Sequence, residues 1–268
     1  MSDNDRVFAG SIPAIYHQYM SPMFFEPYAA DLAERLRNIS SGSILEIAAG
    51  TGVVTRALAH AVSEKVSIIA TDLNQPMLDF AAAKSDGEKI TWKQADAQAL
   101  PFEDGIFDAV VCQFGVMFFP DKVAAYRETR RVLKPGAQFI FNVWDRIEEN
   151  HVAFAVTEAL AALIPDNPPL FMARTPHGYH DRERVQQDLR MAGFSDVKVE
   201  TLRLQSRSTA RNAAIGLCQG TPLRNEIEER MPGQLDEAIE AVKTRLAAKF
   251  GEDDIQASMQ AHIFIACK

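Results

Sequence analysis

The sequence predicts an α/β fold, a doubly wound and mostly parallel sheet that carries helical cap insertions. Two observations lead to this prediction. Short apolar segments rich in β-branched residues alternate five times with helical segments within about 100 residues, as in a parallel sheet. The chain is also long enough to bury a large core, with 268 residues of which 47% are hydrophobic and 24% charged.

The elements of the first half follow in a regular order. Residues 12–40 are expected to be helical, because Leu32, Leu36 and Ile39 recur at helical spacing. Each apolar segment after that helix is short and mostly uncharged, as in a strand buried on both faces. The segments expected to be strands are residues 43–48, 66–72, 90–96, 107–115 and 137–144.

Helices are expected between these strands, and two of them have clear ends. Pro76 suits the first turn of a helix over residues 75–84, where a missing backbone N–H does no harm. A helix over residues 121–133 is predicted to stop at Lys134-Pro135-Gly136, because proline and glycine commonly follow the last turn.

The second half of the chain is less regular. VKVETLRLQ and the closing MQAHIFIACK are expected to be strands, and a helix near residues 181–192 precedes them. About 50 residues of helical pattern separate the two strands, which is too long for a hairpin loop. We therefore expect helical caps over one edge of the sheet. The predicted organisation is a helical segment at residues 1–40 and one domain at 41–268, with cap insertions at about 145–180 and 208–256.

Charge and composition exclude several classes of protein. The formal net charge of −8 argues against a large basic face for nucleic acid or an anionic membrane. No apolar segment is long enough to span a bilayer, and MSDNDRVFAG lacks the pattern of a signal peptide. Cys112, Cys218 and Cys267 lie far apart, so we expect no metal site and no disulfide, but three buried thiols in a cytoplasmic protein.

Candidate binding residues follow the predicted strands, because ligands of open parallel sheets bind beyond the carboxyl ends of the strands. Gly50 and Gly52 follow the first strand and let the backbone approach a ligand closely. Asp72 ends the second strand, twenty positions after Gly52, a spacing that suits a carboxylate on two ribose hydroxyls. Asp96 closes the third predicted strand and can accept from the amine of adenine, and Gln113 lies near the end of the fourth.

Two ligands compete for this pattern. A nicotinamide dinucleotide fingerprint needs Gly or Ala at its third position, where this chain has Thr55. Glu46, just before the glycines, would also repel a pyrophosphate. A ligand with a ribose, an adenine and an ammonium group but no phosphate fits better, and S-adenosylmethionine (SAM) has these groups.

Four motifs resemble, in order, the consecutive motifs of class I SAM-dependent methyltransferases, and especially the small-molecule branch with the UbiE-like enzymes. They are SILEIAAGTGVVTRAL, TDLNQPML, ADAQALPFEDGIFDAVVCQFGVMFFPD and RRVLKPGAQFIFNVW. The resemblance implies a seven-stranded sheet of order 3-2-1-4-5-7-6 with an antiparallel seventh strand, and an N-terminal helix that serves as a lid.

The resemblance also assigns cofactor contacts. The residues implied for the methionine part of SAM are Glu46, Ala48, Gly50, Gly52 and, beside its carboxylate, Gln113; those for the ribose are Asp72 and Leu73, and those for the adenine Asp96 and Ala97. The chain departs from the family in two places, since Ala48 and Ala137 stand where the family usually has glycine.

The methyl acceptor is harder to predict, because methyl transfer from a sulfonium mainly requires alignment of the acceptor and exclusion of water. The candidates for acceptor-side catalytic residues are two tyrosines on the lid helix and two histidines in a proline-rich segment: Tyr16, Tyr19, His177 and His180. The candidates for an apolar acceptor wall are Phe114, Met117, Phe118 and Phe119. The remaining histidines that we interpret as structural are His60, His151 and His262.

The sequence thus predicts SAM-dependent methyl transfer to a small organic acceptor, apolar or aromatic, on O, N, C or S. DNA is not expected as a substrate, because no Asn/Asp-Pro-Pro-Tyr/Phe follows the fourth strand. Two alternatives remain open: a SAM-binding regulatory or scaffold protein without turnover, and an NAD(P)-dependent oxidoreductase. The sequence does not predict the acceptor atom or the oligomeric state.

Overall fold

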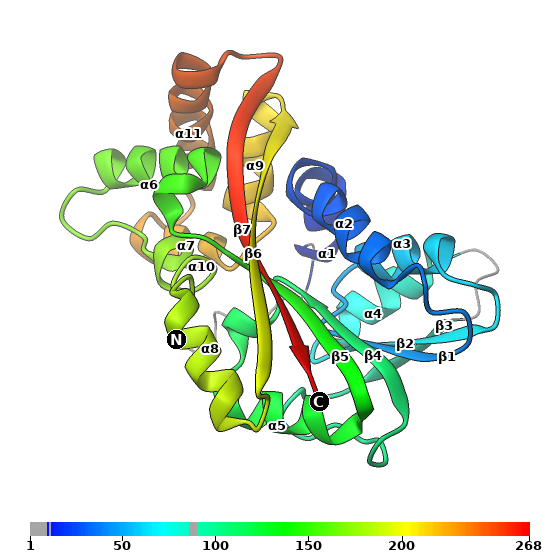
Figure 1. Ribbon diagram of the computed structural model, residues 1–268. Coiled ribbons are helices and arrows are strands. Elements are labelled where there is room, and N and C mark those ends of the chain that lie inside the picture. Colours follow the sequence, from blue (N-terminus) through cyan, green and yellow to red (C-terminus); the bar gives the residue numbers. More distant parts are fainter. Residues whose placement is uncertain (1–9, 11, 86–89) are drawn as a thin grey trace.

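A single seven-stranded sheet runs through the molecule (Figure 1). The computed structural model describes residue 10 and residues 12–85 and 90–268. The strand order is β3-β2-β1-β4-β5-β7-β6, and β7 runs antiparallel to both of its neighbours, β5 and β6, whereas the other pairs are parallel. This confirms the predicted fold class and strand order. The strands are β1 (Gly42–Ile47), β2 (Val66–Asp72), β3 (Ile90–Gln94), β4 (Phe107–Gln113), β5 (Leu133–Trp144), β6 (Asp196–Ser208) and β7 (Ile255–Cys267).

Helices cover both faces of the sheet, as the nearly continuous apolar runs of its central strands require. In Figure 1, α2 and α3 lie on one side and α5 and α8 on the other. α2 packs against α3, and α5 packs against α8. The bounds of the helices that flank the sheet are α2 (Glu26–Leu36), α3 (Val53–Ala61), α4 (Gln75–Ala82), α5 (Lys122–Val132) and α8 (Arg182–Met191).

A further group of helices lies along the β6–β7 pair, with α6, α9 and α11 around its upper part and α7 and α10 beside its middle (Figure 1). There α11 packs against both α9 and α6. β6 and β7 pair along their whole length, from Asp196 with Cys267 to Ser208 with Ile255, and continue beyond Trp144, the last residue of β5. The helices of this region are α6 (His151–Leu163), α7 (Phe171–Arg174), α9 (Ala210–Gln219), α10 (Leu223–Arg230) and α11 (Leu235–Phe250), with a short 3-10 turn η4 (Ile147–Glu149).

The N-terminal helical segment differs from the prediction of one helix over residues 12–40. It is made of α1 (Ile12–Ile15), a π-helix η2 (Tyr16–Phe25) and α2, and the helix ends at Leu36. At the end of η2 the N–H of Glu26 donates to the carbonyl of Ser21, five residues back. Pro22 lies inside η2 and has no N–H to donate to an α-helical partner, which favours this wider turn. Residues 1–9 of the predicted segment lie outside the described residues.

The predicted stop of this helix before Lys134-Pro135-Gly136 is confirmed, although the segment itself is not a separate turn. α5 ends at Val132, and the segment is already part of β5. Leu133 pairs with Phe107 and Gln138 with Ala109, so the extra residues of β5 form a bulge. Proline is tolerated there because a bulged residue makes no ladder hydrogen bond.

Two other predictions concern the cysteines and membrane spans. Cys112 and Cys218 are buried, but Cys267 is partly exposed, so the prediction of three buried thiols was wrong for the last one. Cys267 is on β7 at the C-terminal end of the chain, where less of the core covers it. Among the described residues, no helix has both the length and the apolar composition needed to cross a bilayer.

Candidate active site

A cavity of about 800 Å³ opens where the carboxyl ends of β1, β2 and β4 meet, and we call it the strand-end cavity. Such a position is expected for the ligand of an open parallel sheet. Most of the residues that the sequence assigned to a cofactor line it. They are Ala48, Gly50, Asp72, Leu73, Asp96, Ala97 and Gln113.

Asp72 joins the ends of β1 and β2. Its carboxylate accepts the backbone N–H of Gly50 at 2.9 Å and that of Asn74 at 2.8 Å. Burial raises the pKa of this carboxyl group, and the two N–H donors oppose that change because they favour the charged form. The turn after β1 is thereby held against the end of β2, so that both strands face one cavity.

The turn after β1 needs left-handed backbone at two positions. Gly50 has φ of +56°, and a Cβ placed there would meet no atom within 4 Å, so the backbone is open to the cavity. Ala48 has φ of 56° as well, a conformation that is costly for alanine and free for glycine. This agrees with the resemblance, in which glycine usually stands at this position.

Glu46 and Gly52, which the resemblance also assigned to the cofactor, lie behind this turn and do not line the cavity. The Glu46 side chain is 1% exposed and accepts the hydroxyl of Thr55 at 2.5 Å. Its burial raises the pKa of the carboxyl group to about 8. Gly52 precedes α3 with φ of +78°, and a Cβ there would lie 2.8 Å from the ring of Trp92. Both residues therefore support the turn from its far side.

Gln113 closes the cavity on the side of the N-terminal segment. Its Nε2 donates to the carbonyl of Phe25 at 3.1 Å. Its Oε1 is buried and finds no hydrogen-bond partner within the described part of the chain. A buried acceptor without a partner costs about 1–3 kcal/mol, so a donor from a ligand would be favourable here. Together with the open backbone at Gly50 and the carboxylate of Asp72, this suits the ammonium and ribose groups of SAM.

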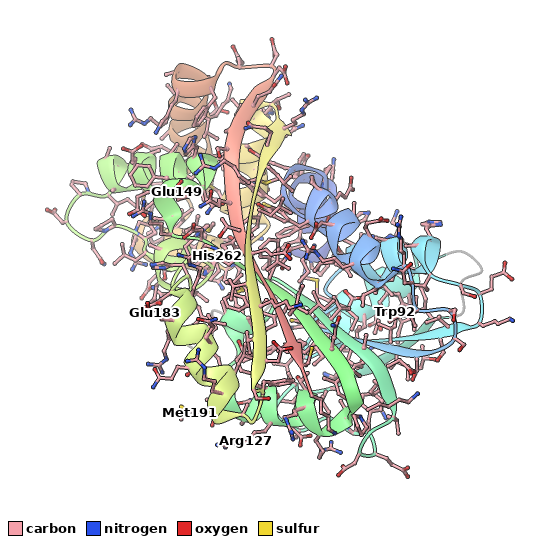
Figure 2. The ribbon with its side chains drawn as sticks, viewed as in Figure 1. Trp92, Arg127, Glu149, Glu183, Met191 and His262 are labelled. Carbon is pink, nitrogen blue, oxygen red and sulfur yellow. The ribbon has the colours of Figure 1, made fainter. Side chains whose placement is uncertain are left out.

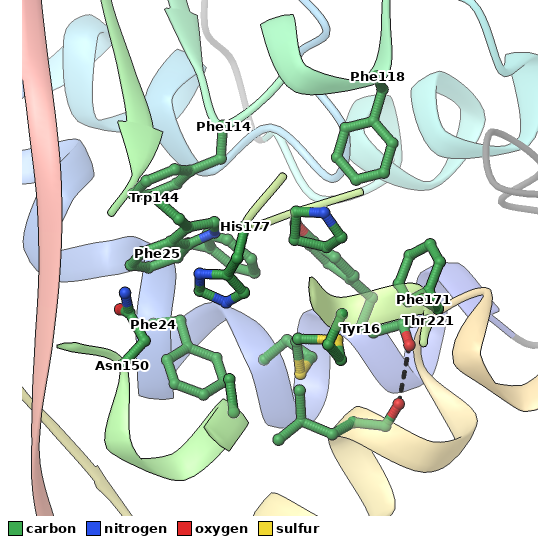
Figure 3. Close-up of a pocket in the computed structure, with 15 residues that line it drawn as sticks. Tyr16, Phe24, Phe25, Phe114, Phe118, Trp144, Asn150, Phe171, His177 and Thr221 are labelled. Carbon is green, nitrogen blue, oxygen red and sulfur yellow. Dashed lines mark hydrogen bonds between the residues drawn. The ribbon is translucent and has the colours of Figure 1, made fainter. Parts of the chain in front are cut away.

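A second cavity, of about 590 Å³, adjoins the first, and we call it the aromatic cavity (Figure 3). Its wall is mostly aromatic and aliphatic, with few polar groups. Three side chains line both cavities: Tyr16, Phe114 and Phe118. The labelled residues of the aromatic cavity come from η2, the segment after β4, the end of β5, the residue before α6, α7, and the loops after α7 and α9. They are Tyr16, Phe24, Phe25, Phe114, Phe118, Trp144, Asn150, Phe171, His177 and Thr221.

Phe114 stands between the two cavities in a fixed position. Its φ is 48°, which is uncommon for a bulky side chain. Its N–H donates to the Oδ1 of Asn142 at 2.9 Å, and its ring stacks on that of Trp144 with centroids 3.7 Å apart and planes 5° from parallel. The hydrogen bond and the stacking together hold the strained residue in place.

The structure separates the predicted acceptor-side residues. Tyr16 lines both cavities and His177 lines the aromatic cavity, whereas Tyr19 and His180 line neither. Among the predicted wall residues, Phe114 and Phe118 line both cavities, Phe119 lines the strand-end cavity and Met117 lines neither.

The histidines that were interpreted as structural line neither cavity. His262 lies on β7 in the middle of the molecule (Figure 2), with its Nε2 3.2 Å from a carboxylate oxygen of Asp145 and its Nδ1 2.9 Å from the hydroxyl of Thr201. No group of three or more His, Cys, Asp or Glu that could hold a metal ion occurs in the described ranges.

Sequence reasoning missed Trp144, Phe171 and Thr221, which complete the aromatic cavity. They lie in segments far apart along the chain, and each resembles an ordinary core residue when read alone. The available signal for this cavity was Trp144 at the end of the fifth strand. Its part in the cavity became visible only when the structure placed that strand beside β4.

Comparison with known proteins agrees with this geometry. Residues 45–141 match the methyltransferase domain family. The ubiquinone/menaquinone biosynthesis C-methyltransferase UbiE of Shewanella frigidimarina is 30% identical over 167 residues, which span 58% of this chain and 66% of that protein. The chain thus covers slightly under two thirds of the length of such relatives.

Solved structures share the fold. A putative SAM-dependent methyltransferase of Methanococcus maripaludis is 25% identical with a TM-score of 0.53, over 75% of this chain and 91% of that one. Phosphoethanolamine N-methyltransferase 2 of Haemonchus contortus, solved with SAM, is 18% identical with a TM-score of 0.60, over 96% of this chain and 56% of that one. The motifs, the sheet order and the match over residues 45–141 together identify a class I SAM-dependent methyltransferase domain in this chain.

Proposed function

We propose that the chain binds SAM in the strand-end cavity and transfers its methyl group to a small apolar or aromatic acceptor in the aromatic cavity. The observation that carries this proposal is the adjacency of the two cavities, which share Tyr16, Phe114 and Phe118. When bound, the cofactor supplies an activated methyl group on a sulfonium. An acceptor on the other side of the shared side chains would lie next to it.

Each residue of the strand-end cavity has a defined part in this proposal. Asp72 would accept the ribose hydroxyls, because Oδ2 of an ionised carboxylate retains a lone pair beyond the one used by Gly50, while Oδ1 accepts from the backbone and side chain of Asn74. Gln113 would accept from the ammonium group through its unpaired Oε1. The residues left for the methionine and adenine parts are Ala48, Gly50, Leu73, Asp96 and Ala97.

The aromatic cavity would align the acceptor and exclude water. Correct alignment of two reactants can supply about 7–11 kcal/mol of the barrier reduction, without any catalytic triad. The segment η2, which carries Tyr16, would serve as the lid over both ligands.

The proposal is tested by the substitutions Asp72→Ala and Gly50→Leu. Each should abolish binding of S-adenosylhomocysteine in titration calorimetry, because one removes the ribose partner and the other fills the open backbone. Two matched controls should retain binding: Asp79→Ala on the exposed face of α4, and Gly233→Leu at a glycine with φ of +71° and equally open surroundings. Wild-type affinity in the Asp72 and Gly50 variants would refute the site.

Turnover needs a second experiment. The protein is incubated with SAM labelled in its methyl group and a metabolite extract, and labelled products are identified by mass. We expect a labelled small apolar or aromatic product. Tight cofactor binding with no labelled product would instead favour the alternative of a SAM-binding protein without turnover.

A further inference from the structure

The aromatic cavity has polar groups in its wall, and most of them are already satisfied by the protein. The hydroxyl of Thr221 donates to the carbonyl of Leu217 at 2.8 Å (Figure 3) and accepts the N–H of Leu223 at 3.2 Å. The Nδ2 of Asn150 lies 3.2 Å from each of three backbone carbonyls, and its Oδ1 accepts the N–H of Gln260 at 3.1 Å. Neither side chain needs a ligand to complete its hydrogen bonds.

His177 differs from these two groups. Its side chain is 4% exposed, and its Nδ1 lies 2.8 Å from the backbone carbonyl oxygen of Asp145. A carbonyl oxygen only accepts, so Nδ1 must carry the hydrogen. Burial lowers the pKa of the imidazole to about 4, so the ring is neutral near pH 7 and Nε2 has a free lone pair. Nothing in the described part of the chain donates to this Nε2.

The ring of His177 is also fixed in direction. The Asp145 carbonyl that holds its Nδ1 is held in turn by the Nδ2 of Asn150, and the Asp145 N–H donates to the carbonyl of Gln260 on β7. Hydrogen bonds that run from Nδ1 through Asp145 to β7 therefore fix the orientation of the ring, and with it the position of Nε2. In Figure 3 the ring stands inside the wall of the cavity, among the rings of Trp144, Phe24 and Phe25.

We infer that Nε2 of His177 is the specificity-determining group of the aromatic cavity and selects flat aromatic acceptors that direct a neutral hydroxyl at it. This inference rests on the proposed function. A neutral hydroxyl fits better than an aliphatic amine, because an ammonium ion would be costly in this apolar wall. An analogue without the hydroxyl would leave a buried acceptor unpaired, and sites built to hydrogen-bond a substrate reject such analogues.

The test uses two probes of nearly equal shape, 4-phenylphenol and 4-methylbiphenyl, in equilibrium dialysis with saturating S-adenosylhomocysteine. Wild-type protein should bind the phenol about tenfold more tightly than the methyl analogue. His177→Phe should abolish that preference, so that the two probes bind with about equal affinity. His177→Gln should restore part of it, because its side-chain oxygen can accept near the position of Nε2. The control His151→Phe, at an exposed histidine of α6, should keep the full preference.

Binding of S-adenosylhomocysteine is measured on the same samples. This distinguishes a failure of the role of His177 from a failure of the proposed function. Equal affinity for the two probes, or no binding of either, in wild-type protein that binds S-adenosylhomocysteine would overturn the role of His177 and leave the proposed function intact. A tenfold preference that persists in His177→Phe would overturn it as well. Protein that binds the phenol selectively but not S-adenosylhomocysteine would contradict the proposed function instead.

Discussion

Glu46 illustrates how burial changes the chemistry of a single residue. Its carboxyl group has a pKa of about 8 in the folded protein, mainly because burial disfavours the charge, against an ordinary value of 4.5. Between these values the folded protein holds a proton that the unfolded chain has lost. The stability that this group contributes is therefore complete below about pH 4.5 and is lost as the pH rises through about 8.

The substitution Glu46→Gln should remove this dependence and still accept the hydroxyl of Thr55. We expect the variant to match wild type near pH 5 and to exceed it at pH 9 by on the order of 1–4 kcal/mol in the free energy of unfolding, without cofactor. Chemical denaturation across this range provides the measurement. Glu103→Gln, at an exposed glutamate, should parallel wild type at every pH. Parallel curves for the Glu46 variant as well would contradict the assignment.

The same residue shows what a sequence leaves undetermined at this scale. Successive side chains of a strand point to opposite faces of the sheet, and a run of apolar residues on both sides of Glu46 does not reveal its direction. The structure points it toward Thr55 on α3 rather than into the cavity. Ala48 is similar, because the sequence marks it as a departure from glycine but only the backbone shows its left-handed φ.

At the scale of elements, η2 is the part that sequence reasoning described least well. Apolar spacing distinguishes a helix from a strand, but a π-helix differs from an α-helix in which carbonyl each N–H contacts. Tyr16 and Phe25 lie at its two ends and stack with centroids 4.9 Å apart. η2 also packs closely on α9, where a Cβ at Gly216 would lie 2.9 Å from the Cβ of Tyr19.

The substitution Gly216→Val should therefore force η2 away from α9. We expect the free energy of unfolding to fall by about 1–3 kcal/mol, as is typical of overpacking, and amide exchange in residues 16–25 to become faster. Denaturant titration and hydrogen-exchange mass spectrometry measure the two effects. Ala248→Val on an exposed turn of α11 is the control for valine in a helix. Unchanged exchange in residues 16–25 would show that the close approach is not needed.

At the scale of the whole molecule, the strand-end cavity collects residues from η2 and from the ends of β1, β2 and β4. A ligand there contacts elements that are distant in sequence, and it binds only the folded chain. S-adenosylhomocysteine at 100 times its Kd should add about 2.7 kcal/mol, or roughly 5–10 °C in Tm for a chain of this size. Thermal denaturation checks this, with Asp72→Ala expected to show no shift. A wild-type Tm that does not change when S-adenosylhomocysteine is added would argue against binding in the strand-end cavity.

The two halves of the site differ in how far the sequence predicts them. The residues of the strand-end cavity follow the strands one after another, so the order of motifs predicts that Gly50, Asp72 and Gln113 lie together at one edge of the sheet, as they do. The aromatic cavity depends on how η2, α7 and α9 fold back over that edge. Those contacts are long-range, and no local pattern around Phe171 or Thr221 encodes them.

The pairing of Ser208 with Ile255 has a consequence for how such a protein changes over time. The chain departs for α9, α10 and α11 and comes back at neighbouring positions on adjacent strands, so the intervening 46 residues, 209–254, form a cassette whose two ends leave the sheet side by side, although its helices also pack on η2 and α6. Insertions, deletions or whole replacements in that cassette leave the threading of the sheet untouched. Leu217 and Thr221 of this segment line the aromatic cavity and none of its residues lines the strand-end cavity, so such changes would reshape the first cavity and leave the second in place.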